Sequence, residues 1–216
     1  MTFPVLSSKD KSKMQKSYPL ELPFRGERTY LHGTDIHQAV LAALGTDLPP
    51  GPISINFHSL LKHQPDLICS RESLRSLRED PAFRGELRFG KGEDLVHAAL
   101  LESSREVTQR KICNENVVAA SAVLDTENKT ATLIKPAIGN PIEIVVFLNK
   151  FLHLKLLPDL SPKWLFARLE LSRALPTQAP QHISLQLKQV LARRFTRSEI
   201  LLDGEVFGSI SFSTPQ

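Results

Sequence analysis

Residues 33–45 read GTDIHQAVLAALG and residues 140–158 read NPIEIVVFLNKFLHLKLLP, and these two stretches decide the fold. In the first, Ile36, Val40 and Leu44 recur at helical spacing, and the other side of the helix carries no charged residue either. A helix that is apolar on almost every side lies inside a protein rather than on its surface. The sequence therefore predicts two buried helices, one in each half of the chain.

The ends of both helices carry local signals. Thr34 or Asp35 can cap a helix over residues 36–44, and Gly45 suits its C-terminal end. The second helix is predicted over 141–156, with one proline at its first position and another just beyond its end. These signals place each helix between turn-forming residues.

Antiparallel strands are predicted around both helices. In residues 53–62, for example, Ile53, Ile55 and Phe57 alternate with polar residues, which is typical of a half-buried strand. Residues 94–108 fit either a helix or a strand, and 71–80 fit a charged helical turn. The other predicted strands are 24–31, 66–69, 83–89, 117–124, 130–134, 164–175, 183–191, 199–202 and 205–212. The fold class is therefore α+β.

Two internal similarities in the sequence suggest different domain organisations. Residues 24–44 and 83–103 both begin with FRGE, whereas the order strand, glycine, helix in the first half recurs around residues 130–156. We favour the second similarity, because it accounts for both apolar helices. It predicts a solvated N-terminal segment and two units, with the bounds 1–20, 21–127 and 128–216.

Composition and charge bound the function. The chain has 216 residues, of which 41% are hydrophobic and 23% charged, as in an ordinary globular protein. The net charge of +4 is small, which argues against nucleic acid as a partner. The dense basic run contains Arg193, Arg194 and Arg197, and it fits either a solvated strand end or a binding site for phosphate.

Cysteine usage and hydropathy exclude further classes. Cys69 and Cys113 are far apart and form no CxxC pair, so neither a zinc site nor a disulfide scaffold is predicted, and no other metal is expected. Without an apolar run of about 18 residues or a signal peptide, we expect a cytoplasmic protein without a membrane span. GxSxG, P-loop, GxGxxG, HExxH and EF-hand motifs are absent, so no cofactor is predicted.

An apolar helix followed by a curved antiparallel sheet, given twice over residues 24–216, resembles the double hot-dog fold. That superfamily contains thioesterases and hydroxyacyl-thioester dehydratases. The resemblance implies two tandem hot-dog-like units, a tunnel for an acyl chain between the two helices, and acyl-CoA or an acyl carrier protein as the partner. The thioester carrier would be a substrate rather than a cofactor, and homo-oligomerisation stays open.

The densest polar run at a helix start is HGTDIH, which begins at His32. A neutral imidazole at His32 can act as general base, and a helix start favours the neutral form. The free N–H groups of Gly33, Thr34 and Asp35 can stabilise an oxyanion. His37 is predicted to line the same pocket.

The resemblance to hot-dog dehydratases implies an acid on the second helix as the partner of His32, and Glu143 is the candidate. Their His-Phe-Pro-Gly-x-Pro motif is absent from this sequence. In the alternative interpretation, Thr34 or Asp35 caps the first helix, and Glu143 interacts with the dipole of the second helix. His32 and His37 then lie at the surface or line a pocket without a catalytic role. The predicted function is therefore an acyl-thioester dehydratase or thioesterase, and the alternative is a noncatalytic ligand-binding or assembly protein.

Overall fold

A computed structural model describes residues 15–113, 115–133, 139–160, 163–176 and 180–215. Within these ranges, 11 strands form one antiparallel sheet in the order β1-β4-β6-β5-β3-β10-β13-β12-β11-β9-β8. The short strands β2 and β7 form a separate parallel pair.

The elements follow one another along the chain with these bounds. The strands are β1 Lys16–Pro19, β2 Phe24–Arg25, β3 Ile53–Phe57, β4 Pro65–Ser70, β5 Phe83–Phe89, β6 Val96–Glu102, β7 Arg110–Lys111, β8 Ala122–Asp125, β9 Thr130–Leu133, β10 Leu165–Leu171, β11 Ile183–Leu191, β12 Phe195–Leu202 and β13 Glu205–Ser213. The helices are α1 Gly33–Leu44, α2 Asn116–Ala120 and α3 Pro141–Leu156, and the 3-10 turns are η2 Gly45–Asp47, η3 Arg75–Glu79 and η4 Gly92–Asp94.

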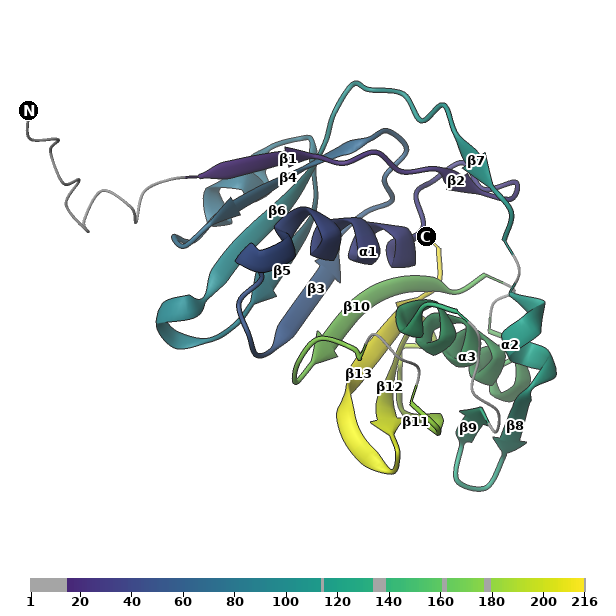
Figure 1. Ribbon diagram of the computed structural model, residues 1–216. Coiled ribbons are helices and arrows are strands. Elements are labelled where there is room, and N and C mark those ends of the chain that lie inside the picture. Colours follow the sequence, from purple (N-terminus) through teal and green to yellow (C-terminus); the bar gives the residue numbers. More distant parts are fainter. Residues whose placement is uncertain (1–14, 114, 134–138, 161–162, 177–179, 216) are drawn as a thin grey trace, which may run out of the picture.

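The sheet has two halves, and one long helix packs against each (Figure 1). Strands β1 and β3 to β6 curve around α1, whereas β8 to β13 curve around α3. The halves join where β3 pairs with β10, with Ile55 opposite Leu169. This arrangement confirms the predicted α+β class with two tandem units, each a helix wrapped by antiparallel strands.

Both long helices are buried as their apolar sequences predict. Ile36, Val40 and Leu44 of α1 are in the core. The second helix, α3, has the predicted bounds, and the side chain of Asn140 accepts a hydrogen bond from the backbone N–H of Ile142 at its start. Such a cap satisfies one of the N–H groups that a helix leaves free at its first turn.

The predicted start of α1 was wrong. The helix begins at Gly33 with His32 as its capping residue, and no side chain caps it. Thr34 and Asp35 lie inside the first turn, where their side chains bond to His32 and Arg25 instead. The two side chains that the sequence assigned to the cap are therefore held by a neighbouring histidine and by an arginine of β2.

Several predicted strands also differ from the structure. Residues 26–31 form a turn and loop after β2, because Gly26 adopts a positive φ of 52° and the chain folds back on itself. Residues 117–120 belong to the helix α2. The ambiguous segment 94–108 contains the strand β6. Position 134, predicted to end a strand, lies outside the described residues.

The predicted domain bounds need two corrections. Residues 16–19 of the segment 1–20 form the strand β1, which pairs with β4, while residues 1–14 lie outside the described part. The predicted boundary at 127/128 divides the hairpin β8–β9. Because β9 pairs with β11, sheet pairing places β8 with the second unit.

Gly208 is a position where the fold tolerates no side chain. It lies in β13 opposite Leu171 of β10, and an added Cβ would meet the carbonyl oxygen of Glu170 and, at 2.9 Å, the Cα of Leu171. Backbone atoms in a paired strand cannot move aside as a flexible side chain can.

We expect Gly208→Ala to lower the free energy of unfolding by about 1–3 kcal/mol, the usual cost of overpacking. Urea denaturation followed by circular dichroism would measure the change. Ser211→Ala, a substitution at a half-buried position of the same strand, serves as the control. Equal stability of the two variants would contradict the steric argument.

Candidate functional site

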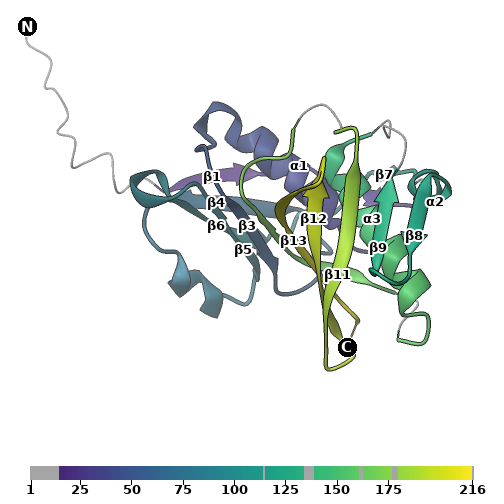
Figure 2. The ribbon, with the colours of Figure 1, turned by 90° about the horizontal axis from the view of Figure 1, so that it is seen from below.

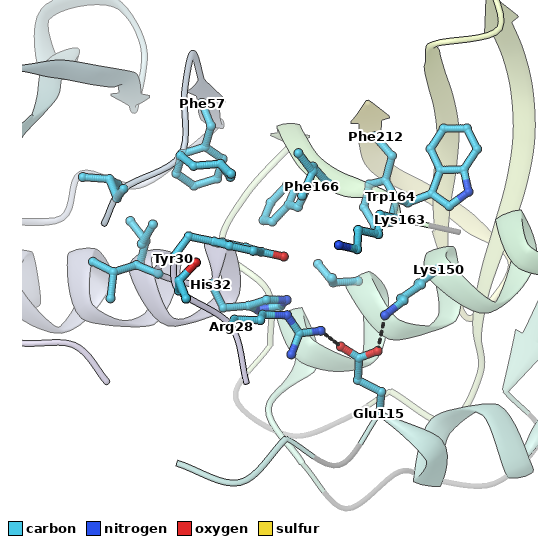
Figure 3. A pocket seen from close by; sticks show the side chains of 18 of the residues that line it. Arg28, Tyr30, His32, Phe57, Glu115, Lys150, Lys163, Trp164, Phe166 and Phe212 are labelled. Atoms are coloured by element: carbon cyan, nitrogen blue, oxygen red, sulfur yellow. Dashed lines mark hydrogen bonds and ion pairs between the residues drawn. The ribbon is translucent and has the colours of Figure 1, made fainter. Parts of the chain in front are cut away.

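A cavity of about 490 Å³ lies where the two units meet. Its lining comes from the loop before α1, the start of α1, the end of β3, the start of α2, one side of α3, and the adjoining ends of β10 and β13. Figure 3 shows side chains from both units around this space. The cavity volume falls within the range of sites for small molecules and cofactors.

His32 lines the cavity at the start of α1 and is itself buried. Burial, together with the nearby cations Arg25 and Arg28, lowers the pKa of its imidazole to about 3, so the ring is neutral at pH 7. The Nδ1 atom lies 2.7 Å from the hydroxyl oxygen of Thr34. Thr34 therefore fixes the ring, and the direction of that hydrogen bond decides the tautomer.

The start of α1 contributes unequally to the cavity. Gly33 lines it, whereas Thr34 and Asp35 do not. The backbone N–H of Asp35 donates to the carbonyl oxygen of His32, so it is not available to an oxyanion. Of the three predicted oxyanion donors, Gly33 is the one whose position fits that role.

Gly33 also allows two aromatic rings to approach the helix. An added Cβ would lie 2.6 Å from Cδ1 of Phe166 and 3.2 Å from Cε2 of Phe57. These rings pack edge to face, with centroids 5.4 Å apart, and both line the cavity. Because Phe57 comes from β3 and Phe166 from β10, the pair forms an apolar wall where the units join.

Glu115 is a carboxylate that lines the cavity and that the sequence analysis did not identify. It accepts hydrogen bonds from Arg28 of the first unit and Lys150 of α3 (Figure 3). Burial raises the pKa of Glu115, but the bonds to Lys150 and Arg28 outweigh that effect and hold its pKa below the usual value. Glu115 is therefore ionised and cannot donate a proton.

Glu143 does not line the cavity, contrary to the expectation that it converges there with His32. Its carboxylate accepts a hydrogen bond from the buried Arg25 instead. Arg25 also donates to both carboxylate oxygens of Asp35, each at 2.6 Å. The predicted acid is therefore part of an ion-pair network beside the cavity. Its negative charge stabilises the positive charge of the buried guanidinium of Arg25.

His37 does not line the cavity either. It is buried, and burial lowers its pKa to about 4. Among the described residues, neither ring nitrogen of His37 has a hydrogen-bond partner. The ring is therefore buried away from the cavity that it was predicted to line.

The predicted phosphate site is also absent from this cavity. Arg193 and Arg194 lie between β11 and β12, and Arg197 lines a separate shallow depression on the sheet. The cations that line the cavity are Arg28, Lys150 and Lys163. They come from loops and a helix, so no clustered basic motif in the sequence revealed them.

Within the described residues, no group of three or more His, Cys, Asp or Glu side chains could hold a metal ion. In the same part of the chain, no helix has the length and apolarity needed to cross a membrane.

Comparison with known proteins gives similarity at the level of structure. No family model matches the chain, and no curated protein matches its sequence. An isomerase-inactive variant of GphF DH1 superposes with a TM-score of 0.51 and 11% identity, over 98% of this chain and 95% of that one.

Two further similar structures have lower scores. An acyl-ACP thioesterase from Bacteroides thetaiotaomicron has a TM-score of 0.46 and 11% identity, over 96% of this chain and 99% of that one. The dehydratase domain of PpsC from Mycobacterium tuberculosis, in complex with C12:1-CoA, has a TM-score of 0.47 and 8% identity, over 92% of both chains.

The order of the elements, the single curved sheet and the GphF DH1 superposition define the class. The chain has a double hot-dog fold, in which two helices are each wrapped by one half of an antiparallel sheet. At such low identity the superposition establishes the fold alone.

Proposed function

We propose that this protein binds an acyl thioester in the cavity and hydrolyses it, with His32 as general base. The observation that carries the proposal is a neutral, oriented imidazole lining a partly apolar cavity at the start of a helix. The wall of Phe57 and Phe166 would contact the acyl chain. The same ligand class appears in the names of the thioesterase and of the dehydratase complex above.

The charges of the cavity support an anionic carrier. Arg28, Lys150 and Lys163 contribute three positive charges, and Glu27 and Glu115 contribute two negative ones. Coenzyme A and the prosthetic arm of an acyl carrier protein both carry phosphate, which basic side chains bind by charge-assisted hydrogen bonds. We therefore assign phosphate binding to the cations of the cavity instead of to Arg193, Arg194 and Arg197.

The reaction needs few groups. Nε2 of His32 takes a proton from water while the water oxygen attacks the thioester carbonyl carbon. The N–H of Gly33 donates to the oxyanion that forms. The C–S bond then breaks, and the proton moves from the imidazolium to the leaving thiolate. In this scheme Nδ1–H of His32 donates to Thr34, so that Nε2 is free to accept.

Hydrolysis fits the cavity better than dehydration. Elimination of water from a hydroxyacyl group needs a protonated acid for the leaving hydroxyl in addition to a base. Glu115 is ionised by its two cationic partners, and Glu143 lies outside the cavity. Tyr30 would have to serve as the acid instead.

Noncatalytic binding of an acyl ligand is the second candidate. It is favoured by the pKa of His32, which burial lowers to about 3, because a general base is most effective when its pKa is near the working pH. A developing oxyanion would raise that pKa during catalysis. Both candidate functions therefore require binding of an acyl ligand, and only the enzymatic one requires turnover of a thioester.

The test measures thiol release from a panel of acyl-CoA and acyl carrier protein thioesters, with ligand binding followed by calorimetry. We expect His32→Ala to lower kcat by about 10²-fold or more, the usual effect of a general base. His58→Ala changes an exposed histidine outside the cavity and is the matched control. Thr34→Val should lower kcat, because the ring of His32 loses the hydroxyl group that orients it. Thr34→Ser keeps a hydroxyl group and should have the kcat of the wild type.

The outcomes separate the two candidates. If the wild type hydrolyses a thioester and His32→Ala keeps full turnover, His32 is not the base. If the wild type binds a thioester without turning it over, the binding function replaces the enzymatic one. If it neither binds nor hydrolyses any thioester of the panel, the proposal fails.

A further inference from the structure

A second recess, of about 370 Å³, lies on the first unit away from the cavity. Strands β5 and β6 form its floor, with Leu87, Ala98 and Ala99 among the lining residues, and the segment that contains η3 forms a wall. Figure 2 shows this segment, in blue, on the opposite face of the strands from α1.

The recess gathers positive charge. Arg75, Arg78 and Arg88 line it together with His97, whereas Glu86 is the carboxylate among its lining residues. Glu86 accepts a hydrogen bond from Arg78. The carboxylate in the recess is therefore already engaged by one of the three guanidinium groups.

The other two guanidinium groups have no such partner. Within the part of the chain that the structure describes, no side-chain hydrogen bond or ion pair involves Arg75 or Arg88. Arg88 lies directly opposite His97 in the β5–β6 pair. Burial lowers the pKa of His97, and the charges of Arg88 and Arg75 lower it further, while Glu86 acts in the opposite sense.

We infer that this recess binds a phosphate-bearing anion, held by Arg75, Arg88 and His97. Two guanidinium groups that face a common space repel one another, and an anion between them would relieve that repulsion. A cleft lined by one sign of charge also concentrates counter-ions. The apolar floor would lower the local screening of these interactions.

Phosphate fits this arrangement better than a carboxylate. A carboxylate is planar and pairs with one guanidinium through two parallel hydrogen bonds. A tetrahedral phosphate presents oxygens in several directions, so it can accept from Arg75, Arg88 and His97 at the same time. The shared chemistry covers inorganic phosphate and a phosphomonoester.

The test titrates the full chain with inorganic phosphate, with glycerol phosphate and with sulfate, at constant ionic strength, by calorimetry and by NMR of the His97 ring. We expect saturable binding and a rise of the His97 pKa in the presence of each anion that binds. Sulfate stays doubly charged between pH 5.5 and 7.5, so its binding should tighten as the pH falls through that range. Tighter binding of glycerol phosphate than of inorganic phosphate would identify a phosphomonoester as the ligand class.

The variant Arg75→Gln/Arg88→Gln should weaken binding at least tenfold. Both side chains are exposed, so the fold should be retained, which circular dichroism would verify. Arg168→Gln removes an exposed arginine of β10 and should leave binding unchanged. Absence of saturable binding, or equal binding by the double variant and the wild type, would overturn the inference.

Discussion

Replacing Arg25 with methionine is expected to destabilise the protein by about 3–5 kcal/mol, the cost of removing one partner from a buried ion pair. Arg25 is 3% exposed and donates to Asp35, which is equally buried, and to Glu143 of α3. Burial disfavours the charge of Arg25, but hydrogen bonds to Asp35 and Glu143 outweigh that effect and raise its pKa. Without Arg25, the buried carboxylate of Asp35 would keep Lys111 as its partner.

The loss should come from a buried carboxylate that has lost one of its two cationic partners rather than from lost volume, since methionine fills much of the same space. Neutralising the carboxylate in the variant Arg25→Met/Asp35→Asn should therefore recover part of the stability. Arg168→Met is the matched control, because Arg168 and Glu170 form an ion pair with side chains that are 47% and 44% exposed. Such pairs contribute less than about 1 kcal/mol.

Chemical denaturation at pH 7 would measure both effects. A loss below about 1 kcal/mol for Arg25→Met would show that the network does not stabilise the fold. Because Arg25 joins β2 and α1 of the first unit to α3 of the second, its removal should also loosen the contact between the units. Faster amide exchange at the start of α1 would report that change.

Acid is expected to destabilise the protein well above the pH at which carboxylates protonate. Burial lowers the pKa of His32 to about 3 and those of His37 and His153 to about 4, against about 6.5 in the unfolded chain. As the pH falls below 6.5, the unfolded chain binds protons that the folded chain does not. Each histidine then lowers the free energy of unfolding by up to about 1.4 kcal/mol per pH unit.

The stability is therefore fully present above pH 6.5 and is lost as the pH falls towards 4. His37 isolates the effect, because neither of its ring nitrogens has a partner among the described residues. His37→Leu should keep or raise stability at pH 7 and reduce the slope between pH 6 and 4.5 by up to about 1.4 kcal/mol per unit.

Urea denaturation at several pH values would give the slope of the free energy of unfolding against pH for the wild type and for His37→Leu. His182→Leu changes an exposed histidine and is the control, for which we expect the slope of the wild type. Carboxylates such as Asp35 and Glu115, whose pKa values are held low by cationic partners, contribute below this pH window. An unchanged slope in His37→Leu would show that this ring is already protonated in the folded state.

Local sequence was sufficient to predict several helices and strands of this protein. The helix α3 was predicted with its bounds, because Asn140, Pro141 and an apolar run define its start and its burial. The strands β5 and β11 were predicted with theirs as well. Hydrogen bonding and side-chain periodicity within a segment are properties of neighbouring residues, so a sequence reveals them directly. The element order then suggested the double hot-dog fold.

Only the tertiary structure decided which side chains meet. His32 was predicted as a cavity residue, because its place at a helix start is a local property, and the structure places it there. Its neighbours depend on how the two units join, and that contact lets Arg25 bind Glu143 and brings Glu115 to the cavity. The partner of a buried charge is set by the tertiary structure, and the separation of two residues in the sequence does not tell how far apart they lie in space.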